Sequence, residues 1–376
     1  MRRREFLGLG LGLATSAAAL AWSRLGRAAD VLWAHTMRPQ NWATPTEYFD
    51  RLITPAPVFF VRSHFGPPSL KPDRTLRVSG LVDTPLTLDA AGLKAFEEVT
   101  ITSVLQCAGN GRALHEPRVA GVQWEHGAMG QAAWTGVRLA DVLKKAGVQA
   151  DARFVQLEGA DRPPKPTVPR YVRGFPVERA LDPTTLIAYR MNGAPLALEH
   201  GAPFRLVVPG WTGNHWIKWL AKIELRKDEP EGFYYATGYR LPKQPVQPGA
   251  AVAPADTRPV TTYPVKSIIG RPADGASAKA GRQEVVGVAF SGEAAIARVE
   301  VSLDGGKTWS EAKLDGESGA ARWQVFRHAF DAAPGRYRAI ARATDQAGQT
   351  QPEHAVWNPS GYLWNAWHAV SWTVIA

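Results

Sequence analysis

The chain of 376 residues is organised around Ser103-Val104-Leu105-Gln106-Cys107-Ala108-Gly109-Asn110-Gly111-Arg112, which holds its only cysteine. The apolar run 99–105 predicts a buried strand, and the small residues after Cys107 predict a tight turn. This order places one sulfur at the carboxyl end of a strand, where backbone can approach a ligand closely. A lone cysteine forms no intramolecular disulfide, and its thiolate is a soft metal ligand or a nucleophile that a cation such as Arg112 makes more available. An inert buried thiol is an equally good interpretation of this stretch alone.

The composition is that of an ordinary folded protein with two or three domains. Hydrophobic residues make up 45% of the chain and charged residues 21%, while 14 tryptophans and 29 prolines favour a loop-rich fold over a helical bundle. The net charge of +10 favours anionic ligands or acidic partners. The sequence contains no block of Lys and Arg and no RNA-binding signature, so nucleic acid is not an expected partner.

The first 29 residues have the layout of a twin-arginine signal peptide. Arg3-Arg4-Glu5-Phe6-Leu7 carries the arginine pair, a weakly apolar stretch follows over 6–23, and small residues end it near Ala29. The alternative is an uncleaved membrane anchor, but glycines and alanines make this stretch a poor span. We therefore expect a periplasmic protein that is exported folded around a cofactor and has no stable membrane span after processing.

A proline-rich linker divides the rest of the chain into two units of different character. Short apolar runs and an amphipathic helix at 137–147 predict a mixed α+β domain over residues 30–245. Residues 241–259 contain five prolines and predict a linker. Strand-like runs at regular spacing predict an all-β immunoglobulin-like sandwich over residues 246–376. These runs are 285–290, 297–303, 323–330 and 337–344, with a hairpin turn at 304–306.

Several cofactor motifs are absent from the sequence. It has no Cys-x-x-Cys-His, no paired cysteines for zinc, no Gly-x-Gly-x-x-Gly after a strand and no Gly-x-Ser-x-Gly. What remains is a scattered set of mostly cationic residues near predicted strand ends, including the end of a strand expected over 57–62. Such residues would suit an anionic cofactor and a small oxyanion, but their spacing does not predict that they converge. They are Arg62, His64, Cys107, Arg112, Asp161, His200, Arg205, Lys218 and Tyr239.

From about residue 40 to the end, the chain resembles the sulfite oxidase family of molybdenum enzymes. Phe60-Val61-Arg62-Ser63-His64 resembles the family's Phe-Val-Arg-Asn-His segment, and 106–112 resembles its molybdenum-cysteine motif. Further motifs occur in the family's order. They are 191–196, 199–210 and 217–220 in the cofactor-binding half, and 357–358 and 365–368 in the C-terminal signature.

The resemblance implies a cofactor, a reaction and partners. It implies molybdenum-molybdopterin bound to the first domain, with Cys107 as the protein's sulfur ligand to the metal, and a homodimer formed by the second domain. It implies oxidation of sulfite, or a related sulfur anion, to sulfate. Electrons would pass singly to an external periplasmic cytochrome c, since we recognise no haem domain in this chain. Arg62, His64, Arg112 and Tyr239 match residues around the substrate. The positions that match cofactor-binding segments are Phe60, Val61, Arg62, Ser63, His64, Asp161, His200, Arg205, Trp216, Ile217 and Lys218.

Departures from the family pattern leave alternatives open. Ser360 stands where vertebrate members carry a substrate-site arginine, and Ala369 stands where an arginine is common, so we expect a less cationic anion pocket. This keeps open a sulfane dehydrogenase subunit of a thiosulfate-oxidising system, which has the same fold. A methionine-sulfoxide reductase fits less well, because that group lacks the sandwich. From another class, a non-catalytic periplasmic binding protein would also account for the sandwich.

Overall fold

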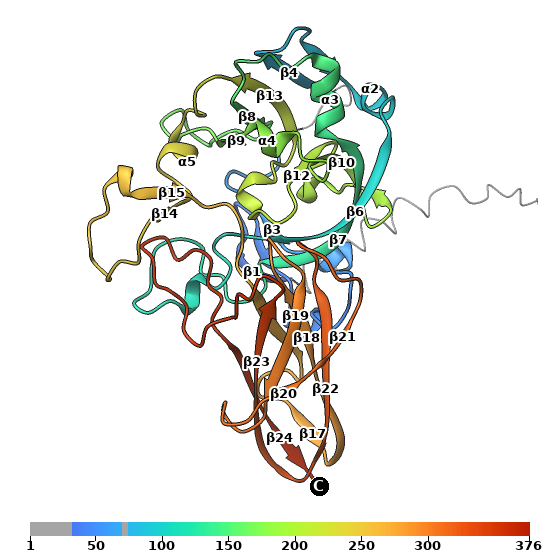
Figure 1. The fold of residues 1–376 in the computed structure, drawn as a ribbon, viewed down its shortest axis with the longest axis vertical. Coiled ribbons are helices and arrows are strands. Elements are labelled where there is room, and N and C mark those ends of the chain that lie inside the picture. The colour runs from blue at the N-terminus through green and yellow to red at the C-terminus, as the bar shows by residue number, and fades with distance from the viewer. Residues whose placement is uncertain (1–31, 70–73) are drawn as a thin grey trace, which may run out of the picture.

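The computed structural model describes residues 32–69 and 74–376, so the predicted signal peptide at 1–29 lies outside the described residues. The molecule is elongated, with a mixed domain at one end and a β-sandwich at the other (Figure 1). Within the described ranges, no helix is long and apolar enough to cross a membrane.

Two sheets share the core of the mixed domain. The first has the order β11 (Ala194–Pro195), β10 (Leu186–Met191), β7 (Met129–Arg138), β6 (Glu98–Gln106), with β12 (Arg205–Val207) also paired to β10. The second has the order β5 (Leu86–Leu88), β4 (Leu76–Gly80), β13 (Leu220–Arg226), β8 (Phe154–Gly159), β9 (Val172–Pro176). All pairings are antiparallel except the parallel pair of β4 with β13. We had expected a mixed α+β domain, and the domain is mostly β with few helices.

In the part of the chain that the structure describes, the helices are short, and the longest is α3 (Leu139–Ala146). Its apolar residues recur at helical spacing and are fully buried, while Lys144 and Lys145 lie on the outer face. The helix ends at Gly147, whose φ of 71° suits a left-handed cap. The predicted helix at 137–147 is therefore confirmed except for its first two residues, which finish β7. The others are α2 (Ala90–Lys94), α4 (Val177–Ala180) and α5 (Phe233–Ala236).

The strand predicted over 57–62 is wrong for most of its length. Ala56–Val58 forms a 3-10 turn, and only Val61–Arg62 is a strand, β3. Proline has no N–H for a sheet ladder but fits the first turn of a helix, which is where Pro57 lies. β3 closes a small sheet with β1 (Trp33–Thr36) and β2 (Asn41–Ala43).

The second domain packs two sheets face to face around one core. The first sheet is β16 (Lys266–Arg271), β18 (Gly281–Phe290), β22 (Gln324–Ala332), β21 (Lys313–Asp315). The second is β17 (Ser277–Lys279), β24 (His368–Ile375), β23 (Gly335–Asp345), β19 (Ile296–Ser302), β20 (Ser310–Glu311). The predicted strand runs are confirmed as parts of β18, β19, β22 and β23. Two short strands lie at the two ends of the predicted linker, β14 (Arg240–Pro242) and β15 (Thr257–Pro259), and they pair with each other.

The sandwich braces the strand that leads to the cysteine. The Val104 N–H in β6 donates to the Ala321 carbonyl at 2.8 Å, and Gln131 Oε1 accepts from the Trp323 N–H at 2.7 Å. Buried side chains from both domains, including Val104 and Trp323, form one apolar cluster at this junction. The second domain therefore fixes β6 from behind.

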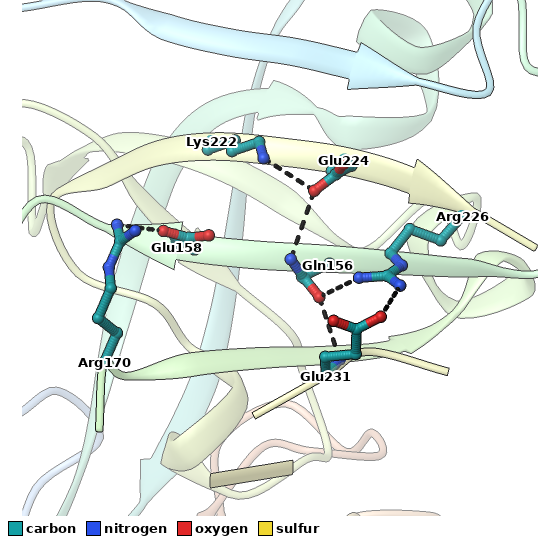
Figure 2. A network of polar contacts seen from close by, with 7 residues as sticks. All are labelled: Gln156, Glu158, Arg170, Lys222, Glu224, Arg226 and Glu231. Carbon is teal, nitrogen blue, oxygen red and sulfur yellow. Dashed lines mark hydrogen bonds and ion pairs between the residues drawn. The ribbon is translucent and has the colours of Figure 1, made fainter. Parts of the chain in front are cut away.

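A network of polar side chains joins β8 to β13 and to neighbouring segments (Figure 2). Gln156 in β8 donates to Glu224 Oε2 in β13 at 3.3 Å, and its Oε1 accepts from Arg226 at 2.9 Å and from the Glu231 N–H at 3.1 Å. Glu158 pairs with Arg170 just before β9. These contacts join β8 to β13 and to the segment just before β9.

Candidate functional site

Cys107 follows β6 directly and lines a cavity. Its N–H donates to the Ala128 carbonyl at 2.9 Å, and its carbonyl accepts from the Asn110 N–H at 3.0 Å, which forms the predicted tight turn. Asn110 fixes the turn, because its Oδ1 accepts from the Ala128 N–H at 3.0 Å. Gly111 has a φ of 93°, a conformation that favours glycine. The cysteine is 9% exposed and opens into the cavity.

The cavity brings together residues from distant parts of the chain. Of the residues predicted for the site, only Val61 and Arg112 are not among its lining residues. Val61 alternates with its neighbours along β3 and is buried. The predicted residues that line the cavity are Phe60, Arg62, Ser63, His64, Cys107, Asp161, His200, Arg205, Trp216, Ile217, Lys218 and Tyr239.

Arg62, His64 and Tyr239 form one cluster. The Tyr239 hydroxyl lies 2.7 Å from His64 Nε2, across 175 residues of sequence. One terminal nitrogen of Arg62 lies 3.2 Å from His64 Nδ1 and 3.3 Å from Nε2, and the other donates to Asn41 Oδ1 at 3.2 Å. Burial, and then the positive charge of Arg62, hold the pKa of His64 well below its usual range. His64 is therefore neutral, and Tyr239 and Arg62 offer polar hydrogens beside it.

A second cluster of cations lies in the same cavity. Lys218 Nζ donates to Ser63 Oγ and to the Glu199 carbonyl, both at 2.9 Å. Arg205 is buried and donates to the His200 carbonyl at 3.0 Å, while its Nε has no acceptor. Burial lowers the pKa of Lys218 to about 7 and that of Arg205 to about 9. No carboxylate of the described residues lies within ion-pair distance of either, so this end of the cavity suits an anion.

His200 and Asp161 complete this end. His200 Nε2 donates to the Ala56 carbonyl at 3.2 Å, and burial lowers the pKa of His200 to about 3, so the ring is neutral. Asp161 follows β8, and burial raises the pKa of its carboxyl group although Lys218 opposes the shift. The neutral His200 ring can therefore lie near an anion without repelling it.

Arg112 lies beside the cavity rather than on its lining. Its Nε donates to the Ser360 carbonyl and its NH1 to the Val122 carbonyl, both at 3.0 Å. The guanidinium lies over the Tyr362 ring, 5.3 Å from the centroid. Tyr362 in turn stacks on Tyr239, with centroids 5.5 Å apart and planes 9° apart.

Tyr171, just before β9, and Arg173, within it, were not among the residues predicted for the site. Tyr171 lines the cavity and stacks on His64, with centroids 4.5 Å apart. Arg173 is fully buried behind Tyr239, with its guanidinium carbon 5.2 Å from the ring centroid. Residues two apart in an extended segment face the same side. The spacing of Tyr171 and Arg173 could therefore have predicted that both side chains face the site.

Known proteins similar to this chain share its domain order. A family model described as "Oxidoreductase molybdopterin binding domain" matches residues 64–234, and one described as "Mo-co oxidoreductase dimerisation domain" matches 257–375. Sulfite oxidase of Arabidopsis thaliana is 33% identical over 345 residues, covering 85% of this chain and 87% of the relative. Human mitochondrial sulfite oxidase is 37% identical over 360 residues, covering 90% of this chain and 65% of the relative. The chain thus spans less than two thirds of the mammalian relatives. The solved sulfane dehydrogenase SoxCD from Paracoccus pantotrophus is similar with a TM-score of 0.79 and 27% identity, over 96% of this chain and 92% of that one.

Proposed function

Because the chain belongs to the sulfite oxidase family, we propose that it oxidises sulfite to sulfate with molybdenum-molybdopterin bound in the Cys107 cavity. The observation that carries this proposal is one cavity that joins three features. They are a thiol, the cations Arg205 and Lys218 with no ion pair to any described carboxylate, and the Arg62–His64–Tyr239 cluster. When bound, the cofactor supplies the transferable oxygen atom and accepts the two electrons. The protein contributes binding and orientation.

The described residues fit such a cofactor. No carboxylate of the described residues forms an ion pair with Arg205 or Lys218, so a phosphate could bind between them, and Arg205 Nε lacks an acceptor. Among the described residues, no group of three or more His, Cys, Asp or Glu could hold a metal ion. A metal at Cys107 would therefore take its other ligands from a cofactor, and the sulfurs of a dithiolene suit a metal that already has a thiolate ligand.

The Arg62–His64–Tyr239 cluster would bind the sulfur oxyanion. Arg62 is a planar, permanently charged donor of the kind that suits oxyanions. The Tyr239 hydroxyl can donate to the anion or to His64 Nε2, because the neutral imidazole has one free acceptor nitrogen. The two residues orient the anion, and His64 Nε2 can fix the hydroxyl by accepting its hydrogen bond.

A metal analysis combined with a sulfite and cytochrome c assay tests the proposal. We expect about one molybdenum per chain and sulfite-dependent reduction of cytochrome c. Cys107→Ser should fold, with an unchanged far-UV circular dichroism spectrum, but should lose molybdenum and activity. Full activity in the serine variant would overturn the proposal. A stably folded wild type without molybdenum and without turnover would instead favour a non-catalytic binding protein.

Sulfane oxidation is the second candidate, favoured by the similarity to the sulfane dehydrogenase over 96% of this chain and by Ser360. The two are separated by parallel assays with free sulfite, thiosulfate and a carrier-bound sulfane. We expect sulfite to give the highest kcat/KM. Turnover of the carrier-bound substrate alone would assign the chain to sulfane oxidation.

The remaining parts of the proposal concern location, assembly and boundaries. We propose a signal peptide over 1–29, a cofactor domain over 30–245 and an immunoglobulin-like domain over 246–376 that forms a homodimer. We also propose export to the periplasm and a cytochrome c acceptor with no haem in this chain. Replacing both Arg3 and Arg4 by lysine should leave the protein in the cytoplasmic fraction. Analytical ultracentrifugation of the loaded protein should give twice the mass of a single processed chain.

A further inference from the structure

Arg173 is a fully buried cation that the proposed function does not yet use. It lies in β9, two residues after Tyr171, and its guanidinium carbon is 5.2 Å from the Tyr239 ring centroid and 5.8 Å from that of Tyr235. In the part of the chain that the structure describes, no carboxylate lies within ion-pair distance of it. Buried charges are normally paired, so this one needs an explanation.

The neutral groups around Arg173 do not satisfy it. NH1 donates to the Tyr234 carbonyl. NH2 lies 3.4 Å from His215 Nε2, but that nitrogen lies 2.9 Å from the Val260 carbonyl and must carry a proton to donate there. Burial and the charge of Arg173 hold the pKa of His215 well below its usual range, which leaves the ring with that one proton. Arg173 Nε has no acceptor at all. The guanidinium thus has one genuine hydrogen-bond acceptor for its five N–H groups.

The contacts of Arg173 lead to the substrate end of the cavity. Tyr239 has Arg173 over its ring and Tyr362 stacked against it, and Tyr362 carries Arg112. Two guanidinium groups therefore flank a stacked tyrosine pair. β9 and the segment before it also support His64, because Tyr171 stacks on that imidazole.

Ser360 supplies no charge to this region. The only described contact that it makes with these groups is through its carbonyl, which accepts from Arg112 Nε. Ser360 therefore adds no positive charge to this region, and its main-chain oxygen accepts one of the hydrogen bonds that Arg112 can donate. A fixed positive charge in a low-dielectric region favours a nearby anion even without direct contact.

We propose that Arg173 supplies, from the cofactor domain and from behind Tyr239, a positive charge that strengthens binding of the substrate anion. This inference rests on the proposed function for the identity of the anion. The charge of Arg173 acts on the anion through space, from behind Tyr239, and makes no direct contact with it. We therefore expect Arg173 to favour a small, highly charged oxyanion such as sulfite.

The test compares Arg173→Met and Arg173→Lys in the full chain loaded with cofactor. For Arg173→Met we expect KM for sulfite to rise about 10- to 100-fold, with kcat within about 3-fold and molybdenum content unchanged. The dissociation constant for sulfate, measured by calorimetry without turnover, should rise in parallel. Arg173→Lys keeps the charge and should stay within about 3-fold of wild type in both constants. The matched control is Arg342→Met, which removes a guanidinium 4.0 Å above the Trp309 ring in the sandwich and should leave both constants unchanged.

A double variant separates charge from packing. Ser360→Arg should restore much of the lost sulfate affinity in the Arg173→Met background but change the wild type less than about 3-fold, a non-additive pair. Unchanged KM and sulfate affinity in Arg173→Met would overturn the inference, as would loss of kcat and molybdenum without a change in affinity. If Arg173→Met does not fold, a loss of tenfold or more in sulfate affinity in Arg173→Lys overturns it. If the wild type does not oxidise sulfite, the proposed function fails, while the sulfate titrations still decide the role of Arg173.

Discussion

Replacing Lys218 by methionine should have two opposite effects. It should lower the affinity for the cofactor, and it should raise the free energy of unfolding of the empty protein. Lys218 Nζ uses two of its three protons on Ser63 Oγ and the Glu199 carbonyl, which leaves one proton and the charge for an anion in the cavity. Removing a charge-assisted hydrogen bond costs about 1.5–3 kcal/mol. That corresponds to cofactor retention weaker by about 10- to 150-fold.

The gain for the empty protein follows from the lowered pKa. Lys218 has a folded pKa of about 7, whereas an unfolded lysine titrates near 10.4. The unfolded chain therefore binds more protons between these values, and the wild-type stability rises with pH across that window. Burying the protonated lysine destabilises the wild type, most strongly at pH 7 and below, and methionine removes this destabilisation. Because Lys218 is partly exposed to the cavity, we expect a gain of about 2 kcal/mol in the free energy of unfolding.

The assay measures molybdenum and phosphorus per chain after extensive dialysis, together with urea unfolding of the empty protein at pH 6 and pH 10. Lys222→Met is the control, since it makes the same change four residues along the chain, at a surface pair with Glu224. Only Lys218→Met should lose cofactor, and only its empty form should be stabilised at pH 6 and not at pH 10. Equal cofactor retention in the two variants would refute the assignment of Lys218 to the cofactor.

Three further predictions address the substrate end, the buried histidines and the cysteine loop. Tyr239→Phe should lower kcat about 10- to 100-fold with molybdenum retained, measured by stopped-flow kinetics and metal analysis; an unchanged kcat would remove the hydroxyl from the reaction. His200 and His368 have pKa values of about 3 and about 4, so the unfolded chain takes up protons below pH 6.5 that the native state does not. The free energy of unfolding of the empty protein should therefore fall by several kcal/mol between pH 6.5 and pH 4, and a flat profile in urea titrations would contradict this. Gly111→Ala would put a Cβ 2.6 Å from Trp364 at a φ of 93°, and should lower the free energy of unfolding by about 2–4 kcal/mol. The control Gly249→Ala meets nothing within 4 Å at a φ of 86° and should cost only about 1–2 kcal/mol; equal losses would show that Trp364 yields.

Much of the fold could be predicted because its signals are local. The strand before Cys107, the turn after it, the amphipathic stripe of α3 and the alternating runs of the sandwich each depend on residues a few positions apart. The error over 57–62 has the same local origin, because the apolar run outweighed the missing N–H of Pro57. The candidate cysteine and most of the cavity residues came from motifs that the resemblance ordered along the chain.

The order of residue types alone established a strand that ends in one thiol, a proline-rich boundary and a β-rich second unit, since backbone periodicity and turn chemistry act over short range. Which side chains meet was settled by packing. Tyr239 reaches His64 across 175 residues, and Arg112 donates to Ser360 across 248. Arg173 acquired its significance only when β9 placed it behind Tyr239. The free energy of such contacts depends on burial and on the absence of competing partners, and those quantities exist only after the sheets and the two domains have packed.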